Sequence, residues 1–188
     1  MILSEVKWRI KDMNLPNKLT MARVLAVPLF VFAFIEKHFW IAILLFCLAS
    51  LTDLLDGKIA RSRGLVTNFG KIMDPLADKI LVYSAFALMV ENGMIPAWVL
   101  IIILAREFTV SGMRTVAASD GLVIAAAKSG KIKTVLQMIA VITLLFLNVI
   151  SSTIITIIAY IFLYASLIMT VYSGFEYIIK NRKVFKNK

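Results

Sequence analysis

The stretch FWIAILLFCLASLTDLLDGKIAR, residues 39–61, joins an unbroken apolar run to a cluster of charged residues. As a helix, Phe39–Leu51 is about 20 Å long, against a bilayer hydrocarbon core of about 30 Å. Thr52 alone separates this run from Asp53. We therefore expect a membrane helix that carries Asp53 and Asp56 somewhat inside one membrane boundary, where ionisable groups are costly and mark functional sites.

A second carboxylate segment follows, GKIMDPLAD at residues 70–78. The apolar run Ile80–Val90 continues from it and gives roughly 17 Å of helix from the opposite membrane surface. Asp78 then lies at a depth similar to that of Asp53, in the same leaflet. The two helices together place four carboxylates near the lipid head groups rather than at the bilayer midplane.

Apolar residues dominate the whole chain: 61% of its 188 residues are hydrophobic, and the mean hydropathy is +0.89. Soluble domains are close to half apolar, so this composition predicts an integral membrane protein. We expect an all-α bundle of six transmembrane helices, forming a single domain over residues 1–188 with no soluble appendage. The six apolar runs are Leu19–Ile35, Phe39–Leu51, Ile80–Val90 with a polar half from Gly70, Ile95–Leu104, Val135–Ile150 and Thr153–Tyr172.

The two ends of the chain are more polar. Ser4–Met13 alternates charged residues with apolar ones, which predicts a short helix lying in the membrane interface. Residues 175–188 form a basic tail. Met1–Lys7 lacks the apolar core and the cleavage site of a signal peptide, so we expect none. Cys47 is the one cysteine of the chain, which excludes an intrachain disulfide.

Lysine and arginine placement predicts the topology. The connections around Glu36–Phe39, Glu91–Pro96 and Asn148–Ser152 hold one basic residue, Lys37, whereas the other connections and both ends are rich in them. By the positive-inside rule, both termini and the two polar loops are cytoplasmic. The net charge of +10 therefore indicates orientation and attraction to anionic lipids, not a nucleic-acid partner. His38, on the outer side, is better read as interfacial than as catalytic.

The carboxylates form two stripes at helical spacing. At 100° per residue, Asp53, Asp56, Gly57 and Ala60 share one face, and Gly70, Asp74 and Asp78 share another. Four anions close together repel strongly, and bound divalent cations remove that conflict. All-oxygen ligation favours Mg²⁺, Mn²⁺ or Ca²⁺, and two such ions suit phosphoryl-type displacement. The structural alternative is a set of helix-end salt bridges to neighbouring lysines and arginines, which explains one such acid better than four on two stripes.

These residues carry a resemblance. The pattern Asp53-x2-Asp56-Gly57-x2-Ala60-Arg61-x8-Gly70-x3-Asp74-x3-Asp78 resembles the complete signature of the CDP-alcohol phosphotransferase family. The resemblance implies a six-helix membrane enzyme, usually a homodimer, that transfers a phosphatidyl group from a CDP-linked lipid to an alcohol and releases CMP. It also implies two metal ions per active site, Mg²⁺ or Mn²⁺.

The resemblance further implies roles for individual residues. Asp53, Asp56 and Asp74 would bind the metal ions, and Asp78 would contact metal and act as the general base on the acceptor hydroxyl. Gly57, Ala60, Arg61 and Gly70 would shape the nucleotide and diphosphate pocket. Asn17, Thr20 and Arg23 share one face of the first predicted span. Asn17 and Thr20 could reach the donor diphosphate, with simple head-group contact as the alternative.

The acceptor alcohol depends on the basic groups around this site. Arg106, Arg114, Lys131 and Lys133 could bind an acceptor that carries its own phosphate, the alternative being head-group contact. Arg106 directly follows an apolar run, and its neighbour Glu107 could orient it. The segments around Asn17–Arg23, Arg106–Arg114 and Gly130–Gln137 resemble the branch of the family that makes phosphatidylglycerophosphate. That branch implies CDP-diacylglycerol as donor and sn-glycerol 3-phosphate as acceptor, at the cytoplasmic side of the cell membrane.

Other functions remain open at this point. A sister enzyme would use inositol phosphate, serine or a second phosphatidylglycerol as acceptor. A cation transporter would also carry intramembrane carboxylates, but it should have polar residues near the midplane and on both membrane faces. The nearly featureless outer connections argue against transport. A purely structural membrane protein leaves the four aspartates unexplained. For the enzyme, we favour direct attack over a covalent intermediate, because Asp78 lies among carboxylates rather than beside a nucleophile.

Overall fold

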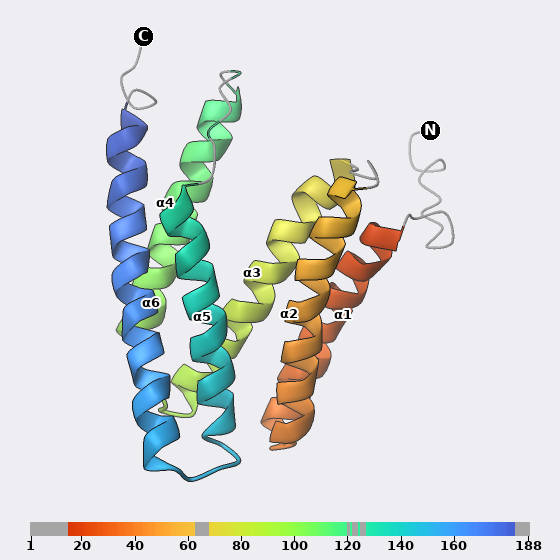
Figure 1. The fold of residues 1–188 in the computed structure, drawn as a ribbon, viewed down its shortest axis with the longest axis vertical. Helices are drawn as coiled ribbons and strands as arrows, with labels where there is room; N and C mark the ends of the chain where they lie inside the picture. Colours follow the sequence, from red (N-terminus) through yellow and green to blue (C-terminus); the bar gives the residue numbers. More distant parts are fainter. Residues whose placement is uncertain (1–14, 63–67, 120, 122–123, 125–126, 183–188) are drawn as a thin grey trace, which may run out of the picture. The chain divides into compact units, whose positions relative to one another are not determined.

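The computed structural model describes residues 15–62, 68–119, 121, 124 and 127–182. Within the helices, the side chains of residues 15, 16, 53–62, 68–72, 74 and 75 lie outside the described part. The expected interfacial helix Ser4–Met13 and residues 183–188 of the basic tail also lie outside it. Six helices follow one another, and the described residues contain no strand: α1 (Leu15–Ile35), α2 (Phe39–Ser62), α3 (Asn68–Glu91), α4 (Ala97–Ser119), α5 (Lys128–Phe146) and α6 (Thr153–Lys180) (Figure 1).

The predicted all-α architecture is confirmed, and the helices are longer than their apolar runs. The fourth run was expected over Ile95–Leu104, yet α4 begins at Ala97 and continues to Ser119. Similarly, α6 continues past Tyr172 to Lys180, so the first residues of the basic tail are helical. A helix satisfies its own backbone hydrogen bonds, so it can leave the apolar layer without unfolding.

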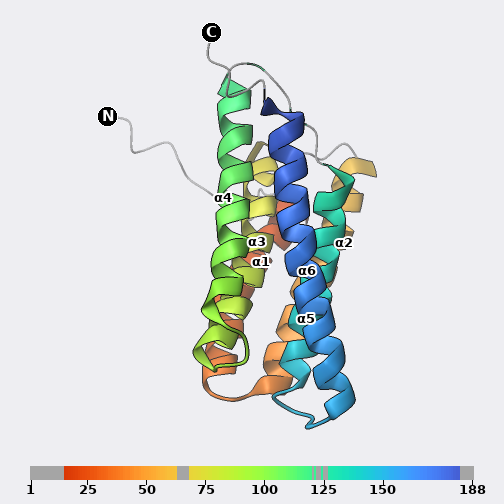
Figure 2. The same cartoon turned by 90° about the vertical axis from the view of Figure 1, so that its left-hand side faces the viewer.

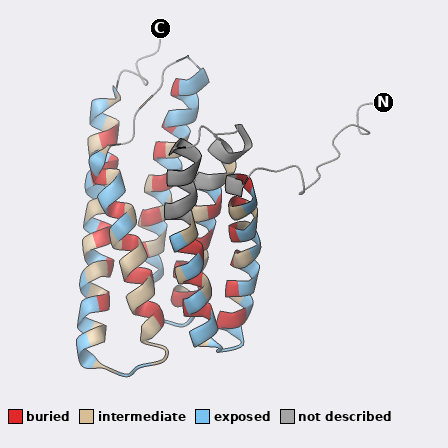
Figure 3. Cartoon of the chain, turned by 45° about the vertical axis from the view of Figure 1, so that its right-hand side comes forward, coloured by how far each residue is buried: buried red, intermediate tan, exposed pale blue. Residues whose placement is uncertain are grey.

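Among the described residues, three helical stretches are long and apolar enough to cross a membrane: Asn17–Ile35, Lys128–Phe146 and Thr153–Lys180. A shorter apolar stretch covers Phe39–Thr52 of α2. Large apolar side chains face outward along these helices, including Phe32 at 64% exposure and Ile154 at 71%. In Figure 3, exposed residues run along the helices opposite the buried ones. Contiguous outward apolar surface of this extent is typical of a protein whose solvent is lipid, so the chain is a membrane protein.

The chain forms two compact units, Met1–Ser84 and Ala85–Lys188, with α3 contributing to both. In the first unit, α1 packs against α2. The rings of Phe30 and Phe46 lie 5.9 Å apart between centroids, and those of Phe34 and Phe39 lie 5.4 Å apart. A tight turn joins the two helices, in which the His38 N–H donates to the Ala33 carbonyl at 2.8 Å. This turn makes α1 and α2 an antiparallel pair.

In the second unit, α6 packs against both α5 and α4 (Figures 1 and 2). Leu144 and Leu145 of α5 and Leu163 of α6 are fully buried there. The Tyr160 hydroxyl of α6 donates to the Met94 carbonyl, at 2.7 Å, in the turn before α4. These contacts hold α4, α5 and α6 together near the start of α4, the end of α5 and the start of α6, away from the polar residues at the start of α5.

Candidate functional site

The aspartate signature lies on two helices. Residues 53–62 are the last turns of α2, and Gly70, Asp74 and Asp78 lie on α3. Asp53 and Asp56 are therefore about one turn apart on α2, as Asp74 and Asp78 are on α3. The predicted helical spacing is confirmed. The side chains of Asp53, Asp56, Asp74, Gly57, Ala60, Arg61 and Gly70 lie outside the described part, so their meeting in one site stays a prediction.

Asp78 is the member of the set whose side chain is described. It is half-buried and takes part in a polar interaction, and its neighbours Ala77 and Leu81 are buried. The donor set as a whole, four carboxylates with no thiolate or imidazole, is the oxygen-rich chemistry that Mg²⁺ and Mn²⁺ prefer. The residues present therefore fit a divalent metal site.

A buried polar face runs along α1. Asn17, Thr20 and Arg23 are 8%, 0% and 1% exposed, and each has a polar partner. The Arg23 Nε donates to the Ala49 carbonyl of α2 at 3.3 Å. Ala49 lies one helical turn before Asp53, so the polar face of α1 lies against the part of α2 that leads into the aspartates. This burial argues against the alternative of simple head-group contact for Asn17 and Thr20.

A second polar cluster joins α4 to α5. The Arg106 guanidinium donates from Nη1 to the Glu107 carboxylate at 2.7 Å, and Lys133 of α5 forms an ion pair with the same carboxylate oxygen. Their side chains are 13%, 8% and 5% exposed, in the order Arg106, Glu107, Lys133. We call these three residues the buried triad. Two of the four predicted acceptor-binding cations therefore meet around one carboxylate.

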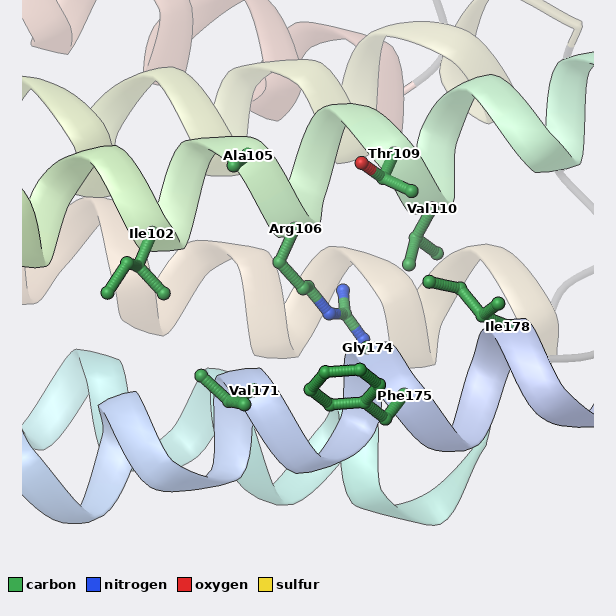
Figure 4. Close-up of a pocket in the computed structure, with 9 residues that line it drawn as sticks. All are labelled: Ile102, Ala105, Arg106, Thr109, Val110, Val171, Gly174, Phe175 and Ile178. Carbon is green, nitrogen blue, oxygen red and sulfur yellow. The ribbon is translucent and has the colours of Figure 1, made fainter.

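Arg106 lies in space left by small residues of the neighbouring helices. Its Nη2 donates to the Ser173 Oγ of α6 at 3.0 Å. A Cβ on Gly174 would lie 3.0 Å from the Arg106 Cγ, and one on Gly130 would lie 3.6 Å from its Nη2. Figure 4 shows the side chain extending from α4 towards Gly174. It lines an apolar groove of about 280 Å³ between α4 and α6, with Ile102, Val110, Val171, Phe175 and Ile178 among its walls.

The other two predicted cations lie apart from the triad. Arg114 is exposed and lies about two turns beyond Arg106 on α4. Its Nε donates to the Tyr177 hydroxyl at 3.1 Å, and its guanidinium lies 5.4 Å from the centre of the Tyr177 ring. Lys131 is exposed on α5. The structure thus brings Arg106 and Lys133 together, and it leaves Arg114 and Lys131 on outer positions of the same unit.

Several members of this cluster were not predicted from the sequence. Ser173 contacts Arg106, Ser129 donates to Glu176, and the Gln137 amide lies 3.5 Å from the Thr170 hydroxyl. A signal for them exists in the apolar run of α6, where three small polar residues recur at helical spacing and are all buried: Ser166, Thr170 and Ser173. Polar residues on one face of an apolar helix indicate that this face packs against protein rather than lipid.

Comparison with known proteins identifies the family of this chain. A family model of CDP-alcohol phosphatidyltransferases matches residues 13–172, a range that includes the whole aspartate signature and the buried triad. A Bacillus subtilis (strain 168) protein named CDP-diacylglycerol–glycerol-3-phosphate 3-phosphatidyltransferase is 42% identical over 188 residues, covering 92% of this chain and 97% of its own length.

Two further relatives agree. A Rickettsia felis protein of the same name is 38% identical, covering 93% of this chain and 98% of its own length. A Mycobacterium tuberculosis protein named probable phosphatidylglycerophosphate synthase is 34% identical, covering 94% of this chain and 85% of its own length. These matches confirm the resemblance carried by the aspartates. The chain belongs to the CDP-alcohol phosphatidyltransferase family.

Proposed function

We propose that this protein transfers the phosphatidyl group of CDP-diacylglycerol to sn-glycerol 3-phosphate, giving phosphatidylglycerophosphate and CMP. The observation that carries the proposal is the complete aspartate signature at helical spacing on α2 and α3. Relatives that share 34–42% of their residues with nearly the whole chain bear the name of this activity or of its product.

In the proposed reaction, the acceptor hydroxyl oxygen forms a bond to the lipid-proximal phosphorus. The bond from that phosphorus to the bridging oxygen of the diphosphate breaks, and CMP leaves with that oxygen. Asp78 accepts the hydroxyl proton as general base, so that the attacking oxygen carries more negative charge as the new bond forms. Mg²⁺ or Mn²⁺ bound by Asp53, Asp56, Asp74 and Asp78 would supply positive charge that stabilises the attacking and leaving oxygens.

The remaining residues bind and orient the two substrates. Gly57, Ala60, Arg61 and Gly70, with Asn17 and Thr20 from α1, would hold the cytidine diphosphate. Arg106 and Lys133 would bind the phosphate of the acceptor, with Arg114 and Lys131 at the edge of the pocket. The buried triad carries two positive charges and one negative charge, so it retains a net positive charge for an anionic acceptor.

The membrane arrangement forms part of the proposal. All six helices would cross the cytoplasmic membrane, with a short N-terminal interfacial helix, both termini in the cytoplasm and the site open to that side. The charge asymmetry of the connections supports this orientation. The enzyme would act as a homodimer, as the family resemblance implies.

The proposal is tested by CMP release from CDP-diacylglycerol in mixed micelles containing the purified full-length protein. We expect release with Mg²⁺ and glycerol 3-phosphate, none after chelation with EDTA, and recovery when Mg²⁺ or Mn²⁺ is added back. Serine, myo-inositol phosphate and phosphatidylglycerol are supplied in parallel reactions. Turnover with one of these in place of glycerol 3-phosphate would move the chain to a sister activity. Absence of CMP release with every acceptor would remove the enzymatic proposal.

A further inference from the structure

Glu107 occupies an unusual place among the buried charges of the second unit. Its carboxylate is 8% exposed and accepts from the preceding residue, Arg106, and from Lys133 on another helix. Neighbouring residues on a helix point about 100° apart and do not normally face each other. The 2.7 Å contact between Arg106 and Glu107 is therefore not one that helix geometry alone provides. The result is one carboxylate shared by two cations from two helices.

This sharing has an electrostatic consequence. Two cations at close range repel in a poorly solvated site, and a carboxylate between them offsets that repulsion. With Glu107 in place, Lys133 can be 4% exposed and still paired. Counted over the three residues of the buried triad alone, two positive charges and one negative charge leave one positive charge in excess.

The hydrogen-bond donors of Arg106 also indicate a site for an anion. Its Nη1 is directed to Glu107 and its Nη2 to Ser173. Its Nε is buried and has no hydrogen-bond partner in the part of the chain that the structure describes. A guanidinium carries five N–H donors, and these contacts leave some of them for a ligand. Anchoring on two sides fixes the plane of the guanidinium, which suits it to bind a phosphate through two oxygens.

We propose that Glu107 is a positioning residue for the acceptor's phosphate: it holds Arg106 and Lys133 beside one another so that the remaining N–H donors of Arg106 and the charge of Lys133 are directed at one phosphate group. This inference rests on the proposed function and extends it to a residue that does not itself contact the acceptor. A carboxylate would repel the phosphate directly, so Glu107 acts through the two cations that it holds.

The test uses the purified full-length protein and the kinetics of CMP release. Glu107→Gln should raise the KM for glycerol 3-phosphate about tenfold or more, the effect expected when a charged hydrogen bond is lost. The KM for CDP-diacylglycerol should not change, and kcat should change less than the acceptor KM. Glu107→Asp, which keeps the charge, should recover part of the acceptor affinity. Glu91→Gln is the matched control, because Glu91 is exposed at the last residue of α3, away from the buried triad, and its KM values should equal those of the wild type.

A double variant separates positioning from a general loss of structure. If Glu107 acts through the cations, Glu107→Gln should raise the acceptor KM by a smaller factor in a Lys133→Met background than in the wild type, because only its contact with Arg106 is then left to lose. Fully additive effects would contradict the proposal. An unchanged acceptor KM in Glu107→Gln would overturn it. So would an equal rise in both KM values together with a lower unfolding temperature.

Binding without turnover keeps this inference separate from the proposed reaction. Glycerol 3-phosphate should raise the thermal unfolding temperature of the wild type, because a ligand that binds the folded state stabilises it. It should raise that of Glu107→Gln much less. Suppose that glycerol 3-phosphate stabilises the wild type more than Glu107→Gln but no CMP is released. The proposed reaction would then be wrong, and the positioning role of Glu107 would still be supported. If glycerol 3-phosphate stabilises neither protein, the positioning role falls as well.

Discussion

At the scale of single residues, the position of Arg106 depends on a glycine in the facing helix. A Cβ on the buried Gly174 would lie 3.0 Å from the Arg106 Cγ, closer than such contacts normally come. Gly174→Ala should therefore shift Arg106 by a few tenths of an ångström. The overpacking costs about 1–3 kcal/mol of stability, of which the better helix propensity of alanine offsets about 1 kcal/mol. We expect a higher KM for glycerol 3-phosphate together with a lower unfolding temperature, measured on the same preparation.

Gly112 offers the matched control. It lies exposed on α4, two positions before Arg114, and a Cβ there would meet nothing within 4 Å. Gly112→Ala should keep the unfolding temperature or raise it slightly, since alanine is the better helix former. If Gly174→Ala behaved like Gly112→Ala in both measurements, the fit between Arg106 and α6 would not matter for the acceptor.

Asp78 is the residue on which the proposed chemistry depends most directly. Asparagine has nearly the same shape but cannot take the acceptor's proton, so Asp78→Asn should lower kcat by about 100-fold or more. The helical content by circular dichroism should remain that of the wild type, because α3 continues through this position. Near-normal CMP release by this variant would remove Asp78 as the general base.

At the scale of the elements, α5 turns its two neighbouring lysines in different directions. Lys133 is 4% exposed and paired with Glu107, whereas Lys131 is exposed. Both were predicted to bind the acceptor phosphate. Because Lys133 is buried in the triad and Lys131 is exposed, we expect Lys133 to contribute more to acceptor binding. Lys133→Met should raise the acceptor KM by a larger factor than Lys131→Met in parallel CMP-release assays. Equal effects, or a larger one for Lys131, would place the acceptor on the outer face of α5.

The sequence alone predicted the helices well because an apolar run marks each of them, and in lipid the backbone of such a run must be hydrogen-bonded internally. It predicted helix ends less well: α4 extends well beyond Leu104. Beyond Leu104, α4 contains polar and charged residues that contact protein and water. Hydropathy measures only how apolar a segment is, so it does not show that the helix continues there. The aspartates were found because their spacing is local to two helices.

The buried triad was harder to predict, because it depends on contacts between residues far apart in the chain. Lys133 lies 26 positions from Glu107, and Ser173 lies 67 positions from Arg106. Basic residues near a span end are usually explained by head-group contact. The useful signal was on α5 itself, where Ser129, Lys133 and Gln137 recur every four residues on the face that continues into the buried Ala140 and Leu144. A polar stripe continuous with a buried apolar stripe indicates an inward-facing lysine.

At the scale of the whole molecule, the orientation in the membrane decides whether the proposed site can meet its acceptor. The turn between α3 and α4 carries an exposed Asn92, and the far end of α4 carries an exposed Ser119. The helix α4, which we propose to cross the membrane, separates the two positions, and basic residues cluster on the side of Ser119. The positive-inside rule therefore predicts Asn92 outside the cell and Ser119 in the cytoplasm.

Single-cysteine labelling tests this orientation, because Cys47 is the one native cysteine and can be replaced by serine. In that background, a membrane-impermeant maleimide added to intact cells should label Asn92→Cys and leave Ser119→Cys unlabelled. Both should react after the cells are permeabilised, which shows that each thiol is accessible. Lys133 of the buried triad lies in the first turns of α5, which follows the connection that begins after Ser119. The reverse pattern would therefore place the buried triad away from cytosolic glycerol 3-phosphate. That result would contradict both the proposed topology and glycerol 3-phosphate as the acceptor.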